Sequence, residues 1–314
     1  MGLKKKLLTS EFRKHFPNTL FDEPLAKYST FNIGGAAAFF YKLKSTEELP
    51  SLIKFCQTHK IPHFLIGGGS NVLFEDKGFR GLIIKIETRN VIIENTEITA
   101  DSGVSIARLI QISIEHGLTG LESWTGLPGT VGGAVRGNAG CNGLEAQAIL
   151  TGALLLNPKN GSIKKANNKY FHYKYRYSKV KETKEIILNA TFKLKKSKIS
   201  GSEQSAMIKK MHKIRIEKQP FGATCGSFFK NPSVDRSAGY LIEQVGLKGK
   251  TIGKAQISQK HANFFLNLGG AKAKDVLKLA ALAQQKVKEK FNIVLEPEVE
   301  IVSFRLCKAN SNMI

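Results

Sequence analysis

Residues 126–143 read GLPGTVGGAVRGNAGCNG, with seven glycines in 18 positions and one charged residue, Arg136. Glycine loses more conformational freedom on folding than any other residue, so such a stretch is costly as a mere surface loop. Glycine also lets the backbone come close to a partner, because no Cβ stands in the way. We therefore expect this backbone to pack closely around a large, flat, phosphate-bearing ligand.

A shorter glycine loop, Gly67-Gly68-Gly69-Ser70-Asn71, lies upstream between the strand-like segments HFLI and VLF. Its N–H groups could approach phosphate closely, and a tight turn between strands is an equally good interpretation. No Gly-Lys-Ser/Thr follows, so it is not a Walker A loop. The residues after it are strand-like, so a Rossmann fold is not supported.

The flanking sequence alternates between helix and strand signals. Ser45 to Glu48 has the capping-box pattern S-x-x-E before a helical segment, which Pro50 weakens in its second turn. Residues 103–118 and 273–291 also predict helices, the latter with apolar side chains at helical spacing. In residues 295–304 we expect a strand with Val299 and Ile301 on one face and Glu298 and Glu300 on the other. The polar segment 193–205 is predicted to be a linker between domains.

Length and composition indicate a globular protein of about two or three domains, with 314 residues of which 42% are apolar. The formal net charge of +23 comes from 48 Lys and Arg against 25 Asp and Glu, and residues 159–218 alone hold 18 basic and 4 acidic side chains. Such a surplus attracts anions, which include phosphorylated substrates and nucleic acid. A nucleic-acid-binding protein is one alternative, because FHYKYRY (171–177) interleaves aromatic and basic residues.

Targeting and metal signals are weak. We expect a cytoplasmic protein, because the amino terminus has no signal-peptide apolar region and no window resembles a transmembrane helix. The four cysteines, Cys56, Cys141, Cys225 and Cys307, form no CxxC, and no histidines pair at metal-ligand spacing. No metal site is expected, and His261 is interpreted as structural.

Seven segments in order resemble one enzyme family: FNIGG (31–35), IGGGSNVL (66–73), GLPGTVGGAVRGNAG (126–140), YRYS (175–178), GSFFKNP (226–232), AGYLIEQVGLKGKTIGKAQISQKHANF (238–264) and LEPEVEI (295–301). This is the UDP-N-acetylenolpyruvoylglucosamine reductase family, within the vanillyl-alcohol-oxidase-like FAD superfamily. The resemblance covers about residues 25–302. The uninterrupted GLKGKTIGKAQISQKHANF is similar to the shorter, type II form.

The resemblance implies an α+β fold in which a two-part FAD-binding domain of the vanillyl-alcohol-oxidase/PCMH type precedes a C-terminal α/β substrate-binding domain. We expect FAD-binding subdomains at 1–85 and 86–202 and the UDP-sugar domain at 203–314. It also implies non-covalent FAD, NADPH as reductant and the enolpyruvyl ether of UDP-N-acetylglucosamine as substrate, in peptidoglycan precursor synthesis. We expect a monomer or weak oligomer, with no specific nucleic acid and no membrane insertion. A flavin-dependent oxidase of the same superfamily is the other alternative.

Three residues match the catalytic positions of the family: Arg176 in YRYS, Ser227 in GSFFKNP and Glu298 in LEPEVEI. The reaction implied delivers hydride to C3 of the enolpyruvyl ether and a proton to C2. Arg176 suits the substrate carboxylate and the charge that develops beside it, and Ser227 is the expected proton donor. Tyr177 stands where an acidic residue is common in the family.

The remaining expected contacts follow the same resemblance. For FAD we expect Ile66, Gly67, Gly68, Gly69, Ser70, Asn71, Gly126, Gly129, Thr130, Gly132, Gly133, Asn138 and Gly140. For the substrate we expect Asn231, Lys218, Arg215 and Gln256, with the two cations binding the UDP diphosphate.

Overall fold

The computed structural model describes residues 2–303, so Cys307 lies outside the described residues. The chain forms two compact units, each assembled from segments far apart in the sequence. Unit 1 takes the chain up to Thr19, Tyr41–Gly68 and Ile84–Arg215, and unit 2 takes Leu20–Phe40, Gly69–Ile83 and the chain from Ile216 onward. The boundaries fall inside strands β2 (Ala36–Leu43) and β5 (Phe79–Ile86) and helix α6 (Gly201–Lys218). A four-stranded sheet has the order β1-β2-β5-β3, with β1 at Leu20–Pro24 and β3 at His63–Ile66.

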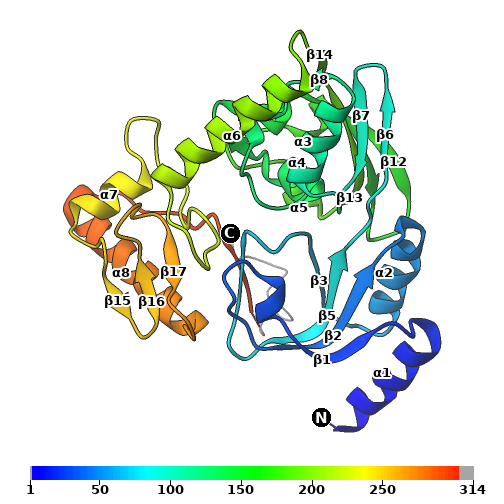
Figure 1. Cartoon of the computed structure of the whole chain (residues 1–314). Helices are drawn as coiled ribbons and strands as arrows, with labels where there is room; N and C mark the ends of the chain where they lie inside the picture. Colours follow the sequence, from blue (N-terminus) through cyan, green and yellow to red (C-terminus); the bar gives the residue numbers. More distant parts are fainter. Residues whose placement is uncertain (1, 304–314) are drawn as a thin grey trace. The chain divides into compact units, whose positions relative to one another are not determined.

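Unit 1 is built around a five-stranded antiparallel sheet with the order β12-β11-β13-β7-β6. Its strands are β6 (Val91–Glu94), β7 (Glu97–Asp101), β11 (Leu150–Leu156), β12 (Ile163–Asn167) and β13 (Ile186–Lys193). Helices α3 (Ile106–Glu115) and α4 (Val131–Gly137) lie beside this sheet (Figure 1). Unit 1 also contains two short strand pairs, β8 (Leu118–Thr119) with β14 (Lys195–Lys196) and β9 (Gly140–Cys141) with β10 (Leu144–Glu145), and the four-residue helix α5 (Val180–Thr183).

The core of unit 1 lies between the sheet and its helices. Trp124 is fully buried at an edge-on contact with Phe192 of β13, and its indole N–H donates to the Leu144 carbonyl at 3.2 Å. Burial of one such aromatic side chain removes about 150–250 Å² from water. A second cluster joins α1 (Gly2–His15) to α2 (Leu49–Thr58), where the rings of Phe12 and Phe55 lie 4.8 Å apart.

Unit 2 holds a three-stranded antiparallel sheet, β15 (Thr251–Ile252), β16 (Ala255–Ile257) and β17 (Phe265–Asn267). Helices α7 (Ala238–Gln244) and α8 (Ala273–Phe291) pack beside it (Figure 1). Strand β18 (Glu300–Val302) pairs in parallel with β4 (Val72–Phe74). The core of this unit therefore combines Phe31, Ile33 and Leu73 with side chains from residues 225–299.

Several expectations for the secondary structure are confirmed. The loop at 67–71 connects β3 to β4, and the helices predicted at 103–118 and 273–291 correspond to α3 and α8. In α8 the apolar side chains at helical spacing, Val276, Leu279, Ala280, Ala283 and Val287, are buried, whereas Phe291 at the end of the helix is half-buried.

The prediction of a capping box at residues 45–48 is wrong. Ser45 makes no cap, a 3₁₀ turn occupies Thr46–Glu48, and α2 begins only at Leu49, so Pro50 lies in the first turn, where proline is tolerated. The Glu48 carboxylate instead accepts a hydrogen bond from the Tyr41 hydroxyl at 2.6 Å. The same pattern does form at the start of α6, where Ser200 Oγ accepts from the Glu203 N–H and Glu203 Oε2 accepts from the Ser200 N–H.

Two further expectations need correction. The predicted linker at 193–205 contains β14 and the first turn of α6, which is attached to unit 1 by the fully buried Gln204. The predicted alternation around Glu298 also fails, because Val299 is buried whereas Ile301 is 36% exposed. The N–H groups of Glu298 and Val299 both donate to the Phe228 carbonyl, and this irregularity breaks the two-residue period.

In the part of the chain that the structure describes, no helix has both the length and the apolar composition needed to cross a bilayer.

Candidate active site

The shorter glycine loop lies directly against the second glycine segment in unit 1. A Cβ on Gly67 would lie 2.3 Å from Thr130 Oγ1, and one on Gly68 would lie 2.9 Å from the Gly129 Cα. Only glycine permits this approach, since Cβ contacts below 3.0 Å are essentially not seen. Lys85 also contacts the loop, because its Nζ donates to the Gly67 carbonyl at 3.1 Å. Burial is the main cause that lowers the pKa of Lys85.

The second glycine segment is partly helical and packed against protein, although its composition predicts a loop around a ligand. It contains α4, which begins after Thr130 and ends at Asn138. A Cβ on Gly132 would lie 2.7 Å from that of Ser102, and one on Gly126 would lie 2.6 Å from Arg215 Cδ. Some of these glycines are therefore needed because other parts of the protein pack against them. The expectation that the glycines surround a ligand did not include this reason.

The residues of the two glycine segments fit a diphosphate-bearing cofactor such as FAD. Within residues 2–303, no group accepts a hydrogen bond from the N–H groups of Gly67 to Ser70. Such a run of uncommitted N–H groups, on a loop with no Cβ in the way, is the donor set that phosphate oxygens require.

Asn138, expected at the cofactor, has its side chain fully engaged by protein. It is completely buried and caps α4 in the left-handed conformation, with φ of 45°. Its Nδ2 donates to Glu145 Oε2 at 3.0 Å and to the Lys174 carbonyl at 3.1 Å, and its Oδ1 accepts from the Gln147 N–H. The side chain therefore joins the end of the glycine segment to the turn that carries Arg176.

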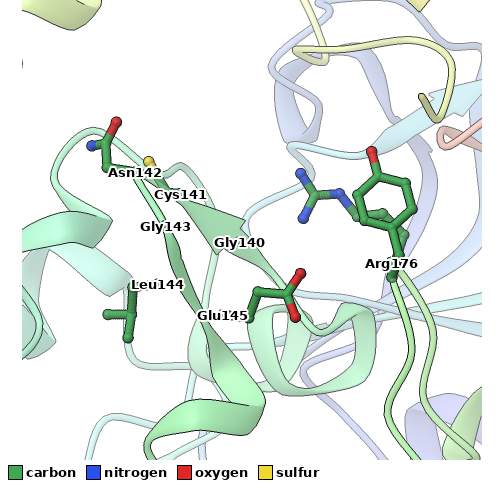
Figure 2. A pocket seen from close by; sticks show the side chains of 8 residues that line it. Gly140, Cys141, Asn142, Gly143, Leu144, Glu145 and Arg176 are labelled. Carbon is green, nitrogen blue, oxygen red and sulfur yellow. The ribbon is translucent and has the colours of Figure 1, made fainter. Parts of the chain in front are cut away.

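Arg176 lies in a two-residue turn between Lys174 and Tyr177, whose backbones exchange hydrogen bonds of 3.2 and 3.1 Å. Its guanidinium Cζ lies 5.2 Å from the centre of the Tyr175 ring. Arg176 faces the β9–β10 hairpin (Figure 2). Between them lies a hollow of about 320 Å³, which is lined by Gly140, Cys141, Asn142, Gly143, Leu144, Glu145, Tyr175 and Arg176. A permanent cation in a concave wall suits a carboxylate ligand.

The two unusual residues of this region have local partners. The Arg136 carbonyl accepts a hydrogen bond from Ser178 Oγ, which ties the end of α4 to the Arg176 turn. The Tyr177 hydroxyl donates to Glu182 at 2.8 Å, and this bond is the main cause that raises the pKa of Tyr177.

Ser227 and Glu298 lie on paired backbone segments of unit 2. The Glu298 N–H donates to the carbonyl of Phe228, the residue after Ser227, at 2.8 Å. Asn71 fixes the other side of Glu298, because its Nδ2 donates to the Glu298 carbonyl at 3.0 Å and its own carbonyl accepts from Glu300. The structure therefore places the backbone segments that carry these two expected catalytic residues side by side. Both are half-buried.

The expected substrate contacts are spread over both units. In unit 1, Arg215 Nη1 donates to Cys141 Sγ at 3.0 Å, beside the hollow that Arg176 lines. In unit 2, Lys218 is exposed, Asn231 Oδ1 accepts from the Ala238 N–H at the start of α7, and Gln256 Nε2 contacts the Gly249 carbonyl at 3.4 Å.

Sequence reasoning missed three residues that shape these surroundings. Asn263 is buried and pairs with both backbone groups of Phe229, donating at 2.8 Å and accepting at 2.9 Å, so it holds the Ser227 segment in place. Cys225 is buried two residues before Ser227; burial first, and then the Glu298 carboxylate, raises the pKa of its thiol. Lys85 is the third, through its contact with Gly67. Only Asn263 lies in a recognised segment, HANF.

Comparison with known proteins agrees with this geometry. Residues 37–167 match the model of the FAD binding domain, which defines the chain as an FAD-binding flavoprotein with an α+β fold. Residues 217–302 match the model of the UDP-N-acetylenolpyruvoylglucosamine reductase C-terminal domain. The chain belongs to the UDP-N-acetylenolpyruvoylglucosamine reductase family of oxidoreductases.

Individual relatives cover nearly the whole chain. The reductase of Caldanaerobacter subterraneus subsp. tengcongensis is 39% identical over 90% of this chain and 92% of its own. That of Listeria monocytogenes serotype 4b is 39% identical over 90% and 94%. The crystal structure of the Thermus caldophilus reductase matches with a TM-score of 0.75 and 30% identity, over 90% of this chain and 97% of that one. The expected fold class and family are therefore confirmed.

Proposed function

We propose that this flavoprotein uses NADPH to reduce the enolpyruvyl ether of UDP-N-acetylglucosamine to UDP-N-acetylmuramate, in peptidoglycan precursor synthesis. Family membership over 90% of the chain carries this proposal. The glycine segments at Gly67–Ser70 and Gly129–Gly133 would hold FAD, together with the other backbone groups expected there. FAD, when bound, supplies the hydride chemistry that links NADPH to C3 of the enolpyruvyl ether.

Arg176 would bind the carboxylate of the enolpyruvyl group. Addition of hydride at C3 leaves negative charge at C2 that spreads into this carboxylate, so a fixed guanidinium stabilises the transition state more than the ground state. The guanidinium lies near the Tyr175 ring, and the missing Cβ of Gly140 leaves room for it.

Ser227 would donate the proton to C2. A hydroxyl is a weak acid, but a carbanion-like carbon is a strong base, so the transfer is feasible when donor and carbon are held together. Glu298, on the paired backbone segment, would act as a hydrogen-bond donor or acceptor beside the reacting carboxylate. For the UDP diphosphate, Arg215 and Lys218 would supply positive charge, and Asn231 and Gln256 would add polar contacts.

The broader expectations belong to the same proposal. We assign FAD binding to subdomains 1–85 and 86–202 and UDP-sugar binding to 203–314; the positions of the two matched family models support this assignment. The enzyme would act in the cytoplasm, as a monomer or weak oligomer.

An anaerobic stopped-flow experiment on the purified holoenzyme tests the function. NADPH should bleach the flavin absorbance, and the enolpyruvyl UDP-sugar should restore it without oxygen. Ser227→Ala should preserve the first step and slow the second by about 100-fold or more, since positioned proton donors contribute about 10²–10⁴-fold. Reoxidation by oxygen but not by the UDP-sugar would favour an oxidase instead. Equal loss of both steps in Ser227→Ala would refute the role of Ser227.

A further inference from the structure

Arg176 has a backbone conformation that its residue type disfavours. Its φ of 54° lies in the left-handed region, which glycine or asparagine adopts far more readily. Turns of two residues commonly place glycine at such positions. A bulky side chain persists there only when its surroundings fix the conformation, and such residues concentrate at functional sites. The contacts that hold this turn are therefore of interest.

Two side chains donate to backbone carbonyls of the turn. Asn138 Nδ2 donates to the carbonyl of Lys174, the first residue of the turn, at 3.1 Å. Lys181 Nζ donates to the carbonyl of Arg176 itself at 2.8 Å. The second bond is charge-assisted and closes a loop of five residues between the start of α5 and the turn. The peptide group that opens the turn, between Lys174 and Tyr175, and the one that follows Arg176 are therefore both held, and this restricts rotation of the backbone between them.

The two donors come from structurally independent places. Asn138 is fixed in the core by Glu145 and the backbone of Gln147. Lys181 belongs to α5, whose residue Val180 is buried. The guanidinium lies close to Gly140 of the hairpin seen in Figure 2, where a Cβ would stand only 3.2 Å from Nη1, so glycine leaves room for it there.

We propose that Lys181 is a positioning residue for Arg176: together with Asn138 it holds the left-handed turn that directs the guanidinium to the substrate carboxylate. This inference rests on the proposed function of Arg176. Lys181 acts through the Arg176 backbone and makes no contact with substrate in this proposal. Loss of Lys181 should therefore affect the half-reaction with the UDP-sugar and spare the reduction by NADPH.

The test compares Lys181→Met with Lys165→Met, which removes the same charge from an exposed position on β12. Flavin content and NADPH reduction should match the wild type in both variants. Reoxidation by the enolpyruvyl UDP-sugar should fall about tenfold in Lys181→Met only, equivalent to about 1.4 kcal/mol of transition-state free energy. Lys181→Arg, which keeps a donor, should recover most of the loss.

A second measurement does not depend on activity. The Tyr177 N–H donates to the Lys174 carbonyl, so hydrogen exchange at Tyr177 reports how firmly the turn is closed. It should speed up about tenfold in Lys181→Met and remain unchanged in Lys165→Met. Equal behaviour of the two variants in both measurements would overturn the proposal. A wild-type enzyme that does not react with the UDP-sugar would instead overturn the proposed function, while the exchange result would still show whether Lys181 holds the turn.

Discussion

Gly67→Ala tests whether the contact between the two glycine segments creates the cofactor site. The new Cβ would lie 2.3 Å from Thr130 Oγ1, about 1 Å closer than the 3.4 Å at which ordinary contact begins. Thr130 is buried and precedes α4, so relief of the clash must displace the loop or the helix start. Overpacking of this kind costs about 1–3 kcal/mol. If the displacement falls on the bound state, the Kd for FAD rises about 5- to 150-fold.

A double-mutant cycle isolates this contact. Thr130→Ala removes Oγ1 and Cγ2 and leaves only its Cβ, 3.3 Å from the new methyl group, and Thr130 Oγ1 makes no cap hydrogen bond that would be lost. The double variant should therefore bind FAD more tightly than Gly67→Ala alone, with a coupling energy of about 1–2 kcal/mol. Titration of the apoprotein by quenching of flavin fluorescence measures each Kd.

Gly137→Ala serves as the control, because it lies in the same glycine segment and a Cβ there meets nothing within 4 Å. It should leave the Kd for FAD unchanged and stabilise α4 by up to about 1 kcal/mol. If Gly67→Ala binds FAD as well as Gly137→Ala does, or if Thr130→Ala gives no relief, the inferred role of the contact is wrong.

Three other predictions concern single side chains. Asp76→Ala removes the carboxylate that accepts from the first two N–H groups of α8, at 2.8 and 3.1 Å, and should lower the free energy of unfolding in urea by about 1–2 kcal/mol, with Asp76→Asn intermediate. Burial would raise the pKa of Glu185, but hydrogen bonds from Lys164 and Tyr170 outweigh it and lower that pKa. Ionised Glu185 therefore stabilises the fold at pH values above its unfolded pKa of about 4.3, and this stabilisation is lost as the pH falls through the folded pKa. Glu185→Gln should lower the free energy of unfolding by about 1–2 kcal/mol at pH 7 and by less in acid. A loss that does not change with pH would contradict this. Lys85→Met should weaken FAD binding about tenfold, because the Gly67 carbonyl loses a charged donor worth about 1.5 kcal/mol, and an unchanged flavin titration would refute this.

Local patterns in the sequence predicted the local elements well. The strand, glycine loop, strand succession around Gly67 and the helices α3 and α8 follow from short-range periodicity. The pattern S-x-x-E occurs at Ser45 and at Ser200, yet only the second forms a capping box. At the first, the Glu48 carboxylate binds Tyr41, a partner that no local rule reveals. The segment 193–205 reads as a linker for the same reason, since its attachment depends on the distant environment of Gln204.

In the candidate site, too, the sequence predicted some residues and not others. The family resemblance located the segments that carry Arg176, Ser227 and Glu298, whose catalytic roles remain predictions. It named Asn138 only as a contact to FAD and did not reveal Asn263 or Lys181, because all three side chains act on backbone carbonyls and N–H groups. A hydrogen bond to the backbone requires no particular residue type at its partner, so it leaves little trace in a single sequence.

The division of the chain into units has a consequence for synthesis on the ribosome. Residues 20–40 and 69–83 belong to unit 2, whose core also requires residues 225–299. Three residues of this core, Phe31, Ile33 and Leu73, therefore emerge early from the ribosome. Their native partners exist only after the last third of the chain has been synthesised. Sheet segments exposed during such a wait are prone to aggregation, and domains usually avoid it by completing folding in order. We expect carboxyl-terminal truncations before Val299 to yield aggregated chains in which unit 1 alone can approach its native fold.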